Sequence, residues 1–254
     1  MFAWVGAAAA ALVALRKGLA EGAYVVFWAL LPAIAVAVMA RDVGPLTMLL
    51  GTAVTAAVLR TMQYWPYALL AAVGAGLASA TALNVAGQAY LAEVLAMVNP
   101  MLEQFRQQGA KINIQAGDVA AVIGVSTCLW SVLAVMLARW WQAVLFRPGG
   151  FREEMWQLRL PPTVTLILVA LLLLLSNMGE VYRFWGICCA LPFIVAGLAL
   201  VHGVVGRLNL GRVWLVVLYV ALSLVGPLWA VIMLVAVLDS WIDFRKRLPV
   251  PPEQ

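Results

Sequence analysis

Residues 139–162 read RWWQAVLFRPGGFREEMWQLRLPP, the most charged stretch of an otherwise apolar sequence. This stretch separates five hydrophobic runs from three more. Its arginines alternate with aromatic side chains, a mixture typical of the level at which lipid headgroups meet hydrocarbon. The pattern predicts an all-α, polytopic transmembrane helix bundle with a charged interfacial segment near its middle.

The second half of this stretch has the spacing of a short amphipathic helix. Phe151, Met155 and Leu158 recur at i, i+4 and i+7, and two prolines follow. We therefore expect residues 151–160 to lie flat on the membrane. The interfacial anchors expected here are Trp140, Trp141, Arg152, Trp156 and Arg159. A basic, aromatic stretch can also bind nucleic acid, but beside membrane spans the headgroup anchor is favoured, and no nucleic-acid partner is expected.

Composition excludes an ordinary soluble domain. Hydrophobic residues make up 65% of the chain and charged residues 11%, against about 25% charged in soluble proteins. The net charge of +5 lies at the ends of apolar runs, where anionic phospholipid explains it. Cys128, Cys188 and Cys189 lie inside apolar runs and say little about the redox compartment.

Eight apolar runs are candidate spans, the first of them short. We place them at about 1–15, 22–39, 43–59, 66–87, 119–138, 163–178, 186–201 and 213–238. Prolines and glycines, among them Gly226 and Pro227 in the last run, predict bends. A basic tail, 239–254, contributes the further anchors Trp241, Arg245, Lys246 and Arg247.

The segment 89–108 is too polar to span a membrane. Its apolar residues keep helical periodicity, and Asn99 followed by Pro100 reads as an N-cap and first helical residue. We expect two short amphipathic helices meeting at Asn99. They either pack on the membrane surface or cover a cavity as a lid, and both interpretations stay open.

Small residues recur every four positions on two predicted helices. Ala3, Ala7 and Ala11 form one row, which predicts contact with a partner helix. Gly76 and Ala80 belong to a second stripe, which continues to two amides, Asn84 and Gln88. We expect this stripe to lie inside the bundle. Asn84 and Gln88, with Ser126 and Thr127 of the fifth span, either join helices by polar contacts or line a cavity; helix contact is favoured.

Catalytic and metal-binding motifs are missing from the sequence. One histidine, His202, excludes an HExxH zinc site and reads as a polar anchor, and there is no GxSxG, Walker, GxGxxG or CxxC motif. Asp239 and Asp243 stand at i, i+4 like metal-binding carboxylates, without the companion residues of membrane phosphotransferases. Asp243 also stands four residues before Arg247, the spacing of a helical ion pair. We therefore expect no enzyme activity, no metal and no cofactor.

Three apolar runs separate residues 151–159 from Arg245 to Arg247. Eight spans would place these two basic segments on opposite sides of the membrane. Nine basic residues would then lie on the side of residues 151–159 and seven on the other side. This small difference leaves the orientation open, with a cytoplasmic tail favoured.

Four boundary motifs carry a resemblance to a known family. They are LRKGLAEG after the first run, FREEMWQLRLPP before the sixth, GLALVHGVVGRLNLGRVW between the seventh and eighth, and LDSWIDFRKRL at the end. Together they resemble the YybS-like family of bacterial integral membrane proteins. The resemblance implies a multi-pass protein of the bacterial cytoplasmic (inner) membrane. It also implies a distant similarity to the substrate-binding S components of energy-coupling-factor transporters, in which Ala3, Ala7 and Ala11 would match a row that contacts a coupling subunit. Those components have about six spans, fewer than the eight predicted here.

Two functional hypotheses follow. The first is a substrate-binding or transport-type subunit that works with partner proteins and has a ligand-sized cavity. The alternative is a structural or assembly protein that binds another membrane protein or itself, without a small-molecule ligand. Membrane lipid is a partner in both.

Overall fold

A computed structural model describes residues 3–109, 113–179, 182 and 184–247, and among these residues it contains helices and turns but no β-strand. The all-α prediction is confirmed. The helices are α1 (Ala3–Arg16), α2 (Leu19–Met39), α3 (Gly44–Met62), α4 (Trp65–Ala86), α5 (Gln88–Gln107), α6 (Ala116–Phe146), α7 (Gly150–Gln157), α8 (Pro162–Asn177), α9 (Gly186–Arg207), α10 (Val213–Leu224), α11 (Leu228–Ile242) and the 3-10 helix η2 (Phe244–Arg247). The start of the first predicted span and the part of the predicted tail after Arg247 lie outside the described residues.

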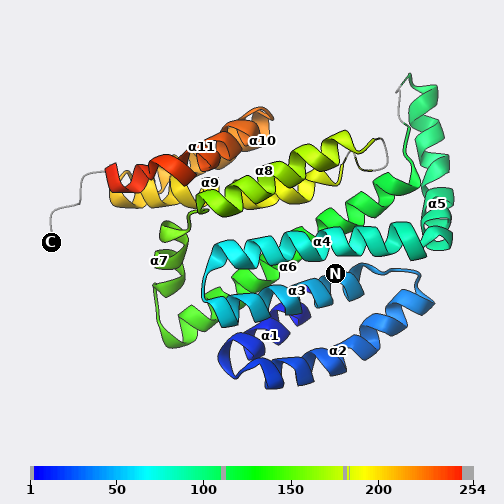
Figure 1. The fold of residues 1–254 in the computed structure, drawn as a ribbon, viewed down its shortest axis with the longest axis horizontal. Coiled ribbons are helices and arrows are strands. Elements are labelled where there is room, and N and C mark those ends of the chain that lie inside the picture. Colours follow the sequence, from blue (N-terminus) through cyan, green and yellow to red (C-terminus); the bar gives the residue numbers. More distant parts are fainter. Residues whose placement is uncertain (1–2, 110–112, 180–181, 183, 248–254) are drawn as a thin grey trace.

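Most of the long helices run side by side, and two helices cross them at opposite ends (Figure 1). Helix α7 lies across the end at which α1, α3, α6, α9 and α11 finish; we call this the basic end. Helix α5 lies across the other end, where α2, α4 and α8 finish; we call this the opposite end. Five helices, α2, α3, α4, α6 and α9, are long and apolar enough to cross a membrane, and the bent pair α7 and α8 makes a sixth if it counts as one span. This architecture is that of a multi-pass membrane bundle.

Helix α6 is the centre of the bundle and contacts α1, α3, α4, α5, α7 and α9. Its closest neighbour is α4, because glycines face each other where the two helices cross. A Cβ atom on Gly76 would lie 2.6 Å from the carbonyl oxygen of Gly124, and one on Gly124 would lie 2.6 Å from that of Gly76. Ala80 is buried beside this crossing. The predicted small-residue stripe therefore lies inside the bundle as far as Ala80.

The stripe does not continue inward to its second amide. Helix α4 ends at Ala86, Gly87 follows, and Gln88 already begins α5. The Gln88 side chain is exposed and its amide donates to the backbone carbonyl of Asn84, which is itself half-buried. An inward-facing Gln88 was therefore a wrong prediction, because the chain changes direction before that residue.

Helix α5 is one helix, not two short helices meeting at Asn99. Pro100 lies inside it and removes the hydrogen bond to the carbonyl of Ala96. Both residues are exposed, so water or headgroups can satisfy that carbonyl, and the helix continues.

The alanine row of α1 packs within the chain. Ala7 and Ala11 are buried, and α1 lies against α2, α3 and α6. Helix α2 crosses α1 closely, since a Cβ on Gly22 would lie 2.5 Å from the Cβ of Ala14. Ala7 and Ala11 thus contact neighbouring helices of the same chain, and both also line an apolar groove between α1, α2 and α3. Contact of this row with a partner helix stays a prediction. Ala3, at the end of the row, is exposed.

The predicted eighth span is a helical hairpin. Helices α10 and α11 are separated by Val225, Gly226 and Pro227, and α11 returns toward the basic end along α9 (Figure 1). With 12 and 15 residues, the two helices are about 18 and 22 Å long, short of a hydrocarbon core of about 30 Å. At the turn, the Trp229 indole nitrogen donates to the carbonyl of Leu222 at 3.1 Å, which satisfies a backbone group that a helix end leaves unpaired. The expectation of a single bent span over 213–238 was therefore wrong.

Gly76→Ala tests the crossing of α4 and α6. We expect a loss of about 1–3 kcal/mol, the usual cost of overpacking, because the added methyl would meet backbone that cannot yield without separating the helices. The control is Gly74→Ala on the same helix, where a Cβ meets nothing within 4 Å. Thermal melting in mild detergent measures both. Equal melting temperatures for the two variants would contradict a backbone contact at Gly76.

Candidate functional site

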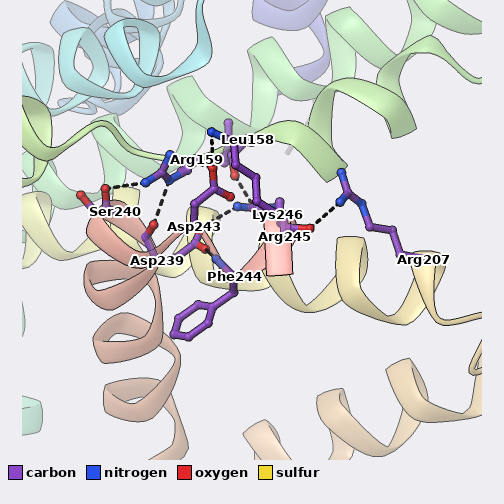
Figure 2. Close-up of polar contacts among 9 residues, drawn as sticks. All are labelled: Leu158, Arg159, Arg207, Asp239, Ser240, Asp243, Phe244, Arg245 and Lys246. Atoms are coloured by element: carbon purple, nitrogen blue, oxygen red, sulfur yellow. Dashed lines mark hydrogen bonds and ion pairs between the residues drawn. The ribbon is translucent and has the colours of Figure 1, made fainter. Parts of the chain in front are cut away.

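The C-terminal hairpin is fastened to the basic end by charged side chains, which we call the C-terminal clamp: Arg159, Arg207, Asp239, Asp243 and Arg245 (Figure 2). At its centre, Nη1 of Arg245 lies 2.5 Å from Oδ2 of Asp239, and the two side chains are only 5% and 4% exposed. Nη2 of Arg245 donates to the carbonyl of Leu158 at 2.7 Å. This buried pair ties the end of α11 to the segment between α7 and α8.

Arg159 caps the end of α11. Its Nε donates to the carbonyl of Asp239 at 2.8 Å and its Nη2 to the carbonyl of Ser240 at 2.7 Å. Both carbonyls belong to the last helical turn and carry the negative end of the helix dipole. That of Asp239 also accepts from the backbone N–H of Asp243 at 3.1 Å. Arg207, at the end of α9, donates to the carbonyl of Arg245 at 2.7 Å. Three arginines from separate segments thus hold the returning chain.

The two carboxylates of the clamp are held by cations and by backbone. Asp243 pairs with Arg159 at 3.1 Å and with Lys246 at 3.2 Å, so the predicted pair with Arg247 was wrong. Burial alone would raise the pKa of Asp243, but Lys246 and Arg159 hold it below the ordinary value of 3.8. Asp239 also accepts from the backbone N–H of Phe244 at 2.9 Å. Within the described residues, no group of three or more His, Cys, Asp or Glu residues is placed to hold a metal ion.

Two predicted headgroup anchors belong to this clamp instead. Arg245 is buried and Arg159 is half-buried, because carboxylates and helix-end carbonyls lie within reach of both. Trp156 is half-buried with its ring against Gly206. Trp141 is also half-buried. The remaining predicted anchors are exposed: Trp140, Arg152, Trp241, Lys246 and Arg247.

A cavity of about 590 Å³, which we call the end cavity, opens at the opposite end between α1, α3, α5 and α6. Ser126 and Thr127, two of the predicted polar residues, line it. The Thr127 hydroxyl lies 2.9 Å from that of Thr47, so the two share a hydrogen bond between α6 and α3. Helix contact and cavity lining, which the sequence left as alternatives, are thus combined at Thr127.

Aromatic and acidic groups complete the walls of the end cavity. The rings of Trp4 and Trp130 lie 6.0 Å apart, centroid to centroid. Asp42 and Tyr90 line the cavity from the α2–α3 turn and from α5. Burial raises the pKa of Tyr90 above its ordinary value of 10.0. The sequence did not single out these four residues, since they lie far apart in the chain; Asn84 and Gln88 are not among the lining residues.

Comparison with protein-family models, curated proteins and solved structures found no match. The similarity to the YybS-like family thus remains a prediction.

Asp239→Asn tests the buried pair of the clamp. We expect a loss of about 3–5 kcal/mol, because the change leaves the Arg245 charge buried without its partner. Lys246→Gln is the control: it removes an exposed cation from the same cluster and should cost at most about 1 kcal/mol. Thermal melting and limited proteolysis after α9 measure both effects. A loss for Asp239→Asn no larger than that of the control would contradict a structural role of the pair.

The clamp also predicts topology. Arg159 and Arg245 contact the same carboxylate cluster, so residues 151–159 and 245–247 lie on one side of the membrane, not on opposite sides as an eight-span count implied. Single cysteines at the exposed positions Gln157 and Lys246, in a background without the three native cysteines, should react equally with an impermeant maleimide in intact cells. A cysteine at exposed Glu103 of α5 should lie on the other side of the membrane. It should therefore be labelled where positions 157 and 246 are protected, or protected where they are labelled. Different labelling of positions 157 and 246 would refute the hairpin.

Proposed function

We propose that this protein is a substrate-binding or transport-type subunit of a bacterial cytoplasmic membrane, which works with partner proteins and takes its ligand in the end cavity. The observation that carries the proposal is the cavity itself. Its volume of about 590 Å³ lies within the range of about 300–1,000 Å³ that is usual for small-molecule sites, and it combines apolar walls with a few polar groups. Helix α5 lies across the same end of the bundle, where it can cover a bound ligand (Figure 1).

The lining residues indicate a class of ligand. Trp4 and Trp130 offer flat apolar faces, and Asp42 adds a negative charge near them. Aromatic faces and a carboxylate together favour a molecule with a cationic group or hydrogen-bond donors. Ser126 adds a hydroxyl that can donate or accept. A small amphipathic molecule with a positively charged or donor-rich part fits these walls.

The distribution of basic residues supports an outward-facing end cavity. Of the 16 Lys and Arg residues, twelve lie at the basic end: Arg16, Lys17, Arg60, Arg139, Arg147, Arg152, Arg159, Arg207, Arg212, Arg245, Lys246 and Arg247. Among the described residues, the opposite end has Arg41 and Arg106. Basic residues near span ends favour the cytoplasmic side. The basic end is then cytoplasmic, and the end cavity opens outward.

The alternative, a structural or assembly protein, is favoured by a second feature. An apolar groove of about 380 Å³ lies between α1, α2 and α3, with Ala10, Ala14 and Gly22 among its lining residues. Small residues of this kind let a further transmembrane helix approach closely. In this alternative, a helix from a partner or from a second copy fills the groove, and the purified protein is a complex of defined mass without a small molecule.

Ser126→Trp tests the ligand site. The larger side chain should fill the end cavity and deplete any small molecule that copurifies with the protein in nanodiscs, as measured by mass spectrometry. Leu129→Trp is the matched control, since Leu129 is exposed on the same helix and does not line the cavity. We expect the wild type and the control to retain the same species. A stable complex of two chains with no small molecule in any variant would favour assembly over transport.

A further inference from the structure

A second cavity, which we call the lateral groove, lies at the basic end between α6, α7, α9 and α10. Its volume is about 540 Å³. The walls are apolar, with Leu133 and Met136 from α6 and Val195 and Leu198 from α9. No described helix fills it, and α10 on its far side has one buried residue, Leu222. Helix α10 contacts α9 and α11, and the groove lies between α10 and α6.

The groove has the depth of one membrane leaflet. Its lining on α6 extends from Leu133 to Val144. At about 1.5 Å of helical rise per residue, this part of α6 is about 16 Å long. Half of a hydrocarbon core of about 30 Å is about 15 Å. An acyl chain lying along α6 would thus reach from the headgroup level to the middle of the bilayer.

The mouth of the groove has a positive charge, Arg152, that pairs with no carboxylate in the described part of the chain. Arg152 on α7 lies over the ring of Trp156, with 4.9 Å between its guanidinium carbon and the ring centroid. The two acidic neighbours are already paired: Glu153 with Arg147 at 3.0 Å and Glu154 with Arg139 at 2.6 Å. An exposed guanidinium at the headgroup level, next to an apolar groove, is complementary to a phosphate that has an acyl chain attached.

Two further polar groups lie on the α9–α10 side of the groove. Nδ1 of His202 lies 2.8 Å from the carbonyl of Leu198, and Nε2 lies 3.4 Å from the hydroxyl of Tyr219 on α10. Because His202 and Tyr219 contact each other and the backbone, they form one wall of the groove. Arg152 is then the charged group at the mouth that can contact a ligand.

We propose that the lateral groove binds one anionic phospholipid, with its phosphate at Arg152 and one acyl chain between α6 and α9. The lipid fills the space beneath α10 and stabilises the C-terminal hairpin. This site is at the other end of the bundle from the end cavity. Lipid binding here can therefore be tested independently of the proposed transport function.

The first experiment measures melting in nanodiscs of phosphatidylcholine with and without phosphatidylglycerol. Wild type should melt higher with phosphatidylglycerol, and Arg152→Gln should lose that gain. Arg152→Lys keeps the charge and should retain most of it. Arg212→Gln, an exposed arginine at the same end that does not line the groove, is the control and should behave as wild type. Equal melting of the wild type in the two membranes, or an equal gain in Arg152→Gln, would overturn the proposal.

The second experiment separates a lipid in the groove from a phosphate at its mouth. Native mass spectrometry of wild type should show one retained phosphatidylglycerol, with affinity lowered about fivefold in Arg152→Gln, the effect of one basic residue near an anionic surface. Ala143→Trp narrows the groove and should lose the lipid, whereas Leu145→Trp, exposed on the same helix, should keep it. Glycerol 3-phosphate alone should give no stabilisation. If it stabilises as well as the lipid, or if Ala143→Trp retains the lipid, no acyl chain lies in the groove.

Discussion

The buried ion pair of Asp239 and Arg245 decides how the second half of the chain is arranged. Removing two charges from water costs several kcal/mol each, and such a pair persists only where further hydrogen bonds satisfy it. Here the carbonyl of Leu158 and the backbone N–H of Phe244 supply two such bonds, while Nε of Arg245 is buried without a partner among the described residues. Leu158 lies at the basic end, so α11 must finish there. Because α9 also finishes there, the apolar run between them has to turn back within the membrane.

The first half of the chain depends on a different constraint. Inside a bilayer, helices gain little from the hydrophobic effect when they associate, so close packing and short interhelical distances matter more. Gly76 and Gly124 allow the backbones of α4 and α6 to touch, which fixes α6 at the centre of the bundle. One part of α6 then lines the end cavity and the following turns line the lateral groove. The crossing therefore positions both cavities.

Local features of the sequence predicted much of this fold. Apolar runs predicted the helical segments, the spacing of small residues predicted the buried face of α4, and Phe151 and Met155 indicated the short helix that the structure shows as Gly150–Gln157. Each of these patterns lies within one helix, so its period can be read from the chain. The same holds for Thr127, a polar residue in the middle of an apolar span.

Contacts between distant segments could not be predicted in this way. The hairpin and a single bent span have the same hydropathy, and Gly226 with Pro227 is compatible with either. The choice is made by Arg159 and Arg245, whose partners lie 84 residues away, at Asp243, and 87 residues away, at Leu158. The end cavity likewise combines residues from four helices and from the α2–α3 turn. Only the folded arrangement brings such residues together.

The hairpin also changes the electrostatic argument for orientation. With eight spans, the basic residues divide almost evenly, because Arg245, Lys246 and Arg247 fall on the side away from α7. Once the chain turns back, these three join the arginines of α7 at one end, and the asymmetry becomes large enough for the distribution of charge to favour one orientation. In that orientation the lateral groove faces the leaflet in which anionic lipids are abundant, and Arg152 lies at their headgroups. Within α6, Trp130 of the end cavity and Leu133 of the groove are less than one helical turn apart. A ligand on the outer side and a lipid on the inner side would therefore contact the same rigid helix, on either side of its midpoint.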